Sequence, residues 1–292
     1  MSVPSQRETS PVALGRAVAA YLEAIAQVRT ENVVANHVSV SKRFLAFFSN
    51  RRYLQELHRQ DLLAFLEWFT HRRGASYTAN TFNLGLEFLR RLGSYAVAQG
   101  WLEESPADEI PFQVIEVTPP DVLTAFEMAR VVEAARADDF NRILVGLLGE
   151  VGLKKQELVA IQFADLELDG PAPEITIRYS GKLKRKSRRL PLPAELAGAL
   201  RHYRVRRHAA GASPLDLVVP VTGRQVNNIV AALCKQAGIR RANPQILRDT
   251  AAVQLLIAGR PPEEVSHQLG YTPRGHLLEF LPRFQVWIGA AE

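Results

Sequence analysis

The chain has 292 residues, of which 47% are hydrophobic and 23% are charged, and 36 Lys+Arg against 30 Asp+Glu give a formal net charge of +6. This length predicts two domains at about 150 residues each, and the apolar fraction excludes wholesale disorder. The longest apolar stretch, residues 143–153, contains Glu150 and is too short to span a bilayer, which needs about 20 residues.

The cellular compartment is indicated by the cysteine count and by the first residues. Cys234 is the single cysteine, so an internal disulfide and a cysteine-rich zinc site are excluded, and a reducing compartment is indicated. The opening segment MSVPSQRETSP has no apolar core of a secretory signal. We therefore expect a soluble cytoplasmic protein, with no membrane partner, no metal and no cofactor.

Residues 1–112 predict an all-helical first domain. Apolar residues at helical spacing indicate four helices, over 14–25, 33–48 and 61–73 and from an N-cap at Ser76 to Gly100. Four helices with short connections form a compact bundle. A proline-containing segment follows at about 103–122 and is predicted to link this domain to the next.

Residues 113–292 predict a second domain of mixed α+β type, mainly helical with a small sheet. Helices are expected over 123–136, 140–150 and 155–161, before three short strands over 161–168, 174–179 and 188–192. Five helices should follow, over 193–208, 223–237, 244–258, 261–268 and 276–287, and Pro282 should kink or interrupt the last.

Positive charge is concentrated in the second domain. Residues 178–207 contain 11 basic residues and one acidic residue, Glu195. A local field of one sign indicates a polyanion partner, although a solvated hairpin and helix face would give the same pattern.

Five short motifs stand in order within the second domain. The first four are G-L-K-K-Q-E-L at 152–158 with D-L at 165–166, G-K-L-K-R-K at 181–186 with P-L at 191–192, Q-I-L-R-D at 245–249, and L-G-Y-T at 269–272. The fifth is the single position 280, nine residues after Tyr271. Together they resemble the motifs of the tyrosine recombinases, the phage integrase or Xer-like family. The resemblance spans roughly residues 12–288. It implies an N-terminal four-helix, SAM-like core-binding domain and a catalytic-type domain, which together clamp double-stranded DNA.

The resemblance also implies where the active site should lie. Members of this family attack a phosphodiester with a tyrosine oxygen, without a metal, while cationic donors stabilise the charge on the phosphate. The equivalent positions here are Lys154, Lys182, Gln245, Arg248, Tyr271 and Phe280. Phe280 stands where the family has its nucleophilic tyrosine and has no oxygen. Lysine at 154 keeps a charge but lacks the planar fork of arginine.

These departures predict a protein that binds DNA without cutting it. The predicted phosphate-binding residues are Lys154, Lys182, Lys184, Arg185, Lys186 and Arg248. Such a pseudo-recombinase would work with an active recombinase partner or occupy a DNA site, and its C-terminal helix could mediate self-association.

Two other functions remain open at this stage. The chain could be an active recombinase in which Tyr271 has become the nucleophile, or a helical protein–protein scaffold with incidental basicity. Individual residues also have simpler explanations. Lys154 could be a surface lysine, Arg248 could be an ion-pair partner of Asp249 or Glu157, and Phe280 could be a core residue.

Overall fold

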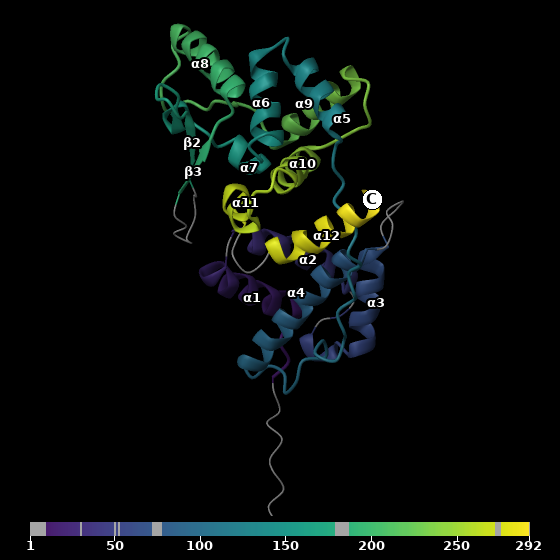
Figure 1. Cartoon of the computed structure of the whole chain (residues 1–292). Coiled ribbons are helices and arrows are strands. Elements are labelled where there is room, and N and C mark those ends of the chain that lie inside the picture. Colours follow the sequence, from purple (N-terminus) through teal and green to yellow (C-terminus); the bar gives the residue numbers. More distant parts are fainter. Residues whose placement is uncertain are drawn as a thin grey trace, which may run out of the picture. The chain divides into compact units, whose positions relative to one another are not determined.

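The computed structural model describes residues 10–29, 31–49, 51, 53–71, 78–178, 187–271 and 276–291. These residues form two compact units, one extending to Glu116 and the other beginning at Val117. The described chain is mainly helical, and its strands form one small sheet (Figure 1). No helix in the described part is long and apolar enough to cross a membrane.

The first unit is a helical bundle, as the sequence predicts. Its elements are α1 (Leu14–Val28), α2 (Glu31–Phe47), the 3-10 helix η1 (Leu54–Glu56), α3 (Arg59–Thr70) and α4 (Ala79–Ala98). The core is rich in aromatic rings. Phe44 of α2 meets Phe65 of α3 and Phe88 of α4 edge-to-face, with ring centroids 5.4 and 5.5 Å apart. Edge-to-face pairs of this kind stabilise a core beyond the area that they bury.

One polar pair is buried inside this aromatic core. The Nδ1 atom of His37 and the hydroxyl of Tyr21 lie 2.7 Å apart, and both side chains are almost completely buried. Burial lowers the pKa of His37 and raises that of Tyr21. Both groups are therefore neutral at pH 7 and satisfy one another.

Two boundaries of the first unit differ from the sequence prediction. Helix α4 has Thr78 as its N-cap, whose hydroxyl accepts from the Thr81 N–H, whereas the predicted cap, Ser76, lies outside the described residues. The predicted linker also begins later than residue 103, because Ala107 and Ile110 are buried in the core of the first unit. Ala107 and Ile110 lie between the prolines of this segment, and their burial anchors its first part to the bundle.

The second unit comprises more and shorter elements. They are α5 (Ala125–Ala135), α6 (Asp139–Gly149), α7 (Lys155–Leu158), the 3-10 helix η2 (Phe163–Asp165), β1 (Leu166–Glu167), β2 (Glu174–Ile177), β3 (Arg188–Pro191), α8 (Ala194–Ala209), α9 (Gly223–Gln236), α10 (Pro244–Ile257), α11 (Pro262–Leu269) and α12 (His276–Ala291). Helix α6 contacts α5, α8 and α10 and is buried on every side from Arg142 to its end (Figure 1). An apolar helix of this kind forms the centre of a core.

The sheet is antiparallel in the order β1-β2-β3. Register pairs Ile175 with Leu190 and Ile177 with Arg188, and these four side chains are buried. Arg188 therefore takes an inward position that alternation would give to an apolar residue. The predicted strand over 161–168 is wrong in most of its length, because residues 163–165 form η2 and only Leu166–Glu167 join the ladder.

Of the two outcomes predicted for Pro282, a kink or an interruption of the last helix, the interruption is wrong. Helix α12 continues from His276 to Ala291 with Pro282 inside it. Proline removes one backbone hydrogen bond, and packing offsets this loss. Phe284 and Trp287 stack on each other and pack against the cluster that Val265 and Leu269 of α11 help to form.

Candidate functional site

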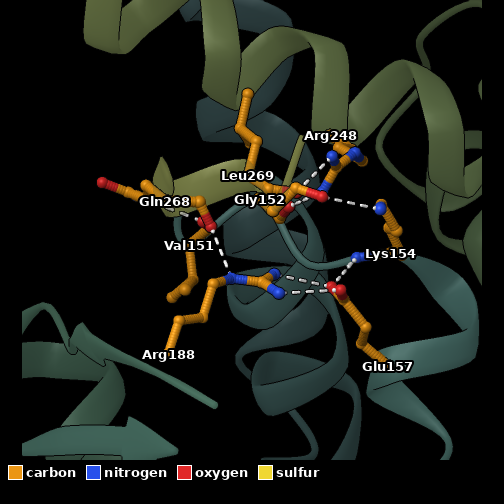
Figure 2. A network of polar contacts seen from close by, with 9 residues as sticks. Val151, Gly152, Lys154, Glu157, Arg188, Arg248, Gln268 and Leu269 are labelled. Atoms are coloured by element: carbon orange, nitrogen blue, oxygen red, sulfur yellow. Dashed lines mark hydrogen bonds and ion pairs between the residues drawn. The ribbon is translucent and has the colours of Figure 1, made fainter. Parts of the chain in front are cut away.

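A buried ion pair joins α7 to β3. The Nη1 and Nη2 atoms of Arg188, which is only 3% exposed, donate to the two carboxylate oxygens of Glu157 at 2.9 and 2.8 Å. Its Nε donates to the main-chain carbonyl of Gln268 at 3.0 Å (Figure 2). The bidentate geometry fixes β3 against α7 and against the end of α11.

Lys154 is held by the same network. Its backbone N–H donates to Glu157 Oε2 at 2.9 Å, which caps α7. Its ammonium donates to the carbonyl of Gly270 at 3.0 Å (Figure 2). A cation is favoured at the carbonyl end of a helix, so this ammonium stabilises the end of α11.

Arg248 lies at the centre of the site and is 2% exposed. Its Nη2 donates to the Leu269 carbonyl at 2.6 Å, and its Nη1 donates to the Gly152 carbonyl (Figure 2). The phenol of Tyr271 is a further hydrogen-bond partner of Arg248, and none of its described hydrogen bonds goes to the carboxylate of Asp249 or Glu157. A guanidinium is always charged, so its carbonyl partners hold a permanent cation inside the unit.

Gly152 explains why the first motif begins with glycine. Its φ of +81° is rarely adopted by residues with a side chain, and a Cβ here would lie 2.5 Å from Cδ2 of Leu269. The missing side chain thus allows the turn after α6 to approach α11 and to present its carbonyl to Arg248.

Tyr271 lies beside the same arginine. The Arg248 guanidinium carbon is 4.9 Å from the centroid of the Tyr271 ring. Burial raises the pKa of the phenol, although the charge of Arg248 partly opposes this shift. The phenol of Tyr271 is therefore harder to deprotonate than an exposed tyrosine, which is unfavourable for a nucleophile.

Gln245 and Asp249 form a pair on one face of α10. The amide nitrogen of Gln245 donates to Asp249 Oδ1 at 2.8 Å. Burial raises the pKa of the Asp249 carboxyl, and the hydrogen bond from Gln245 opposes that shift. The pair thus puts an amide where the family resemblance implies a proton-carrying histidine.

A hollow of about 300 Å³ opens beside Arg248. It is lined by Lys155, Asn227, Asn243, Pro244, Gln245 and Arg248. The ammonium of Lys155 donates to the Asn227 side-chain oxygen at 3.3 Å.

The structure therefore brings four of the six implied positions into one region, namely Lys154, Gln245, Arg248 and Tyr271. Lys182, Lys184, Arg185 and Lys186 lie outside the described residues. Phe280 is in α12, and its side chain lies outside the described part of the chain. Sequence reasoning missed the roles of Arg188 and Gln268. The alternation of buried and exposed positions along β3 could have indicated that Arg188 is buried. No sequence pattern indicated a role for Gln268.

Comparison with known proteins agrees with this fold. The phage integrase family matches residues 121–277, and the phage integrase SAM-like domain matches residues 14–112. Tyrosine recombinase XerC of Roseiflexus sp. (strain RS-1) is 26% identical over 276 residues, which cover 87% of this chain and 85% of that protein. The second unit is thus a catalytic-type domain behind a SAM-like domain.

Solved structures share the architecture. The XerH site-specific recombinase bound to palindromic difH substrate, a post-cleavage complex, has a TM-score of 0.71 and 18% identity, covering 100% of this chain and 99% of that one. A lambda integrase dimer bound to a COC' core site has a TM-score of 0.69 and 16% identity, covering 94% and 77%. The chain belongs to the phage integrase family of tyrosine recombinases, which act in site-specific recombination.

Proposed function

We propose that this chain is a DNA-binding member of the family that does not itself cleave DNA. The observation that supports this most directly is Phe280, which stands nine residues after Tyr271 where the family motif has its nucleophilic tyrosine. A phenyl ring has no oxygen, so transesterification cannot begin there. Such a protein would act with an active recombinase partner or by occupying a site on DNA.

The geometry around Tyr271 supports the same proposal. A shifted nucleophile would need an accessible oxygen and a neighbouring base. Burial raises the pKa of Tyr271, and the nearby Gln245 is an amide that already donates to Asp249. These contacts disfavour the active-recombinase alternative.

Duplex DNA as the partner is supported by charge and by the relatives. Residues 178–207 carry 11 basic residues and one acid. The XerH and lambda integrase structures are complexes with their own DNA sites. A protein–DNA interface of this kind loses affinity steeply with salt, because bound counterions are released.

A covalent-trapping assay on a nicked suicide substrate tests the absence of cleavage. The wild type, Tyr271→Phe and Phe280→Tyr should all form no covalent DNA adduct. Phe280→Tyr restores the oxygen but leaves Lys154, Gln245 and Tyr271 in place of an arginine and two histidines. Losing one preorganised donor typically costs about 3 kcal/mol of transition-state stabilisation.

The matched control is a four-site revertant that combines Lys154→Arg, Gln245→His, Tyr271→His and Phe280→Tyr. An adduct in this revertant alone would support an intact scaffold with lost chemistry. An adduct in the wild type that disappears in Tyr271→Phe would refute the proposal in favour of the shifted nucleophile.

DNA binding is tested by measuring affinity for duplex DNA across a salt series. Replacing Lys182, Lys184, Arg185 and Lys186 with alanine should reduce the salt dependence by roughly one unit of slope for each phosphate that is no longer neutralised. An unchanged slope would remove this segment from the interface, and salt-independent or absent binding would favour the scaffold alternative.

A further inference from the structure

The connecting segment, residues 111–123, contains a stretch that neither unit holds. The boundary between the units lies within it, after Glu116. Residues 111–119 are all exposed, and the side chains of Val114, Ile115 and Val117 are 88%, 51% and 52% exposed. Among the described residues, no hydrogen bond or ion pair involves residues 114–117. Exposed backbone without such bonds has little to fix it, so residues 114–117 are the least constrained part of the connection.

The first unit holds one end of the connecting segment through two side chains of α4. The amide nitrogen of Asn83 donates to the Gln113 carbonyl at 2.9 Å, and its amide oxygen accepts from the Gln113 N–H at 2.8 Å. The Nη2 atom of Arg90 donates to the carbonyls of Asp108 and Ile110 at 3.1 and 2.5 Å. The attachment to the first unit therefore extends to Gln113.

The second unit holds the other end, and Arg283 of α12 makes the outermost attachment. Its Nε donates to the Thr118 carbonyl at 2.9 Å, and its Nη2 donates to the Pro119 carbonyl at 3.4 Å. One guanidinium thus binds two successive carbonyls, which its forked arrangement of donors allows. These bonds join the connecting segment to the last helix of the chain.

Beyond this attachment the connecting segment is fixed without Arg283. Pro120 is buried, and the Leu123 N–H donates to the Thr250 hydroxyl at 2.9 Å. Loss of the Arg283 contacts alone would therefore release residues 118–119 and leave the rest of the segment in place.

The helix that carries Arg283 is itself attached by apolar contacts. Phe284 and Trp287 stack on each other and pack against the cluster that includes Val265 and Leu269 of α11. Arg283 stands next to Phe284 in this helix. If α12 moved away from the cluster, the guanidinium would move with it and the two carbonyls would lose their donor.

We propose that Arg283 is a latch that couples the connecting segment to α12. While α12 is packed on its cluster, the unattached part of the connection is residues 114–117. When α12 leaves the cluster, the unattached part extends to Pro119. An extended residue spans at most about 3.3–3.6 Å, so the release adds about 7 Å to the reach of the connection. The position of α12 thus sets how far the two units can separate, whether or not the protein binds DNA.

The first test is limited proteolysis of the native full-length protein with thermolysin, which cleaves before apolar residues such as Val114, Ile115 and Val117. A protease binds several residues on either side of the cleaved bond in extended form, so the rate reports how often the ends of the stretch are released. Arg283→Gln should raise the initial rate at these three residues about fivefold, the factor expected for one ordinary hydrogen bond.

Two matched controls accompany this variant. Arg224→Gln removes a charge from an exposed position in α9, and Gln285→Ala changes an exposed position in α12. Both should be cleaved at the wild-type rate. Mass spectrometry of the fragments identifies the cleaved bond, so cuts at residues 114–117 are counted separately from cuts elsewhere.

The second test asks whether α12 acts through Arg283. Trp287→Ala weakens the packing of α12 and should also raise the rate at residues 114–117. In the Arg283→Gln background the same substitution should add little, because the latch is already open. Circular dichroism checks that each variant is folded. If Trp287→Ala loses helix, Trp287→Leu takes its place, since it removes the ring stacking and keeps an apolar side chain.

Two results would overturn the proposal. If Arg283→Gln is cleaved no faster than Arg224→Gln, Arg283 does not restrain the connecting segment. If the effects of Arg283→Gln and Trp287→Ala multiply in the double variant, α12 acts on the segment by a route other than this arginine. A faster rate in each single variant, with no further increase in the double variant, supports the latch.

Discussion

Glu157→Gln removes one partner from the buried pair with Arg188 while keeping the shape of the side chain. Glu157 accepts two bonds from Arg188 and one from the Lys154 N–H. Glutamine keeps one oxygen and turns an NH₂ group toward the guanidinium, which leaves a buried cation without a counter-charge. Breaking a buried pair in this way costs about 3–5 kcal/mol. For a unit of this size the Tm should fall by about 6–20 °C.

The assay measures hydrogen exchange by mass spectrometry at increasing urea concentrations. Peptides from each unit then report the unfolding of that unit separately. Peptides of α6 and α10 should lose protection at lower urea, and those of α3 and α4 should not change. The control is Glu133→Gln, because the pair of Glu133 with Arg136 is exposed and lies within one helix region. Exposed pairs contribute about 0–1 kcal/mol.

A double variant, Glu157→Leu with Arg188→Met, separates charge from packing. Apolar replacement of a buried pair is often neutral or stabilising, so the double variant should be more stable than Glu157→Gln. The reasoning is refuted if Glu157→Gln loses no more stability than Glu133→Gln.

Two further predictions concern a turn and a buried histidine. Gly152→Ala should destabilise the second unit by about 1–3 kcal/mol more than Gly211→Ala does, as measured by urea unfolding. Both glycines have a positive φ, but of the two only Gly152 has a neighbour that an added Cβ would strike. Equal losses of stability in the two variants would contradict the steric argument. Burial lowers the pKa of His37 in the folded state, so as the pH falls the histidine is protonated in the unfolded state before it is protonated in the folded state. The stability of the first unit should therefore fall as the pH drops below about 6.5, the ordinary pKa of histidine. His37→Gln should remove this dependence in urea unfolding between pH 7 and pH 5, and an unchanged pH profile would show that another group is responsible.

Much of the fold could be predicted because apolar periodicity records which face of each helix is buried. Apolar residues at helical spacing predict a helix between Ser76 and Gly100, and Phe82, Leu86 and Leu89, which follow this spacing in α4, are all in the core. The start of this helix was predicted less well, because serine and threonine are both favoured N-caps, and residue type alone does not show that Thr78 accepts from the Thr81 N–H.

The site was predicted less completely, because its contacts join residues far apart in the chain. Glu157 and Arg188 are 31 positions apart, and Arg188 stands in a basic run that looks like surface in the sequence. Lys154 and Lys155 have the same side chain and adjacent positions. Which one faces the hollow depends on Gly270 and Asn227, which no local pattern connects to them.

The carbonyl partners of Arg248 also bear on the order in which the chain folds during synthesis. Gly152 precedes Arg248 by 96 positions, and Leu269 follows it by 21. During synthesis Arg248 is therefore added to the chain before its second acceptor, and it leaves the ribosome before that acceptor does. The core of the first unit, by contrast, ends at Ile110. We expect the bundle to reach its native state while translation continues, and the recombinase site to assemble only once α11 has left the ribosome.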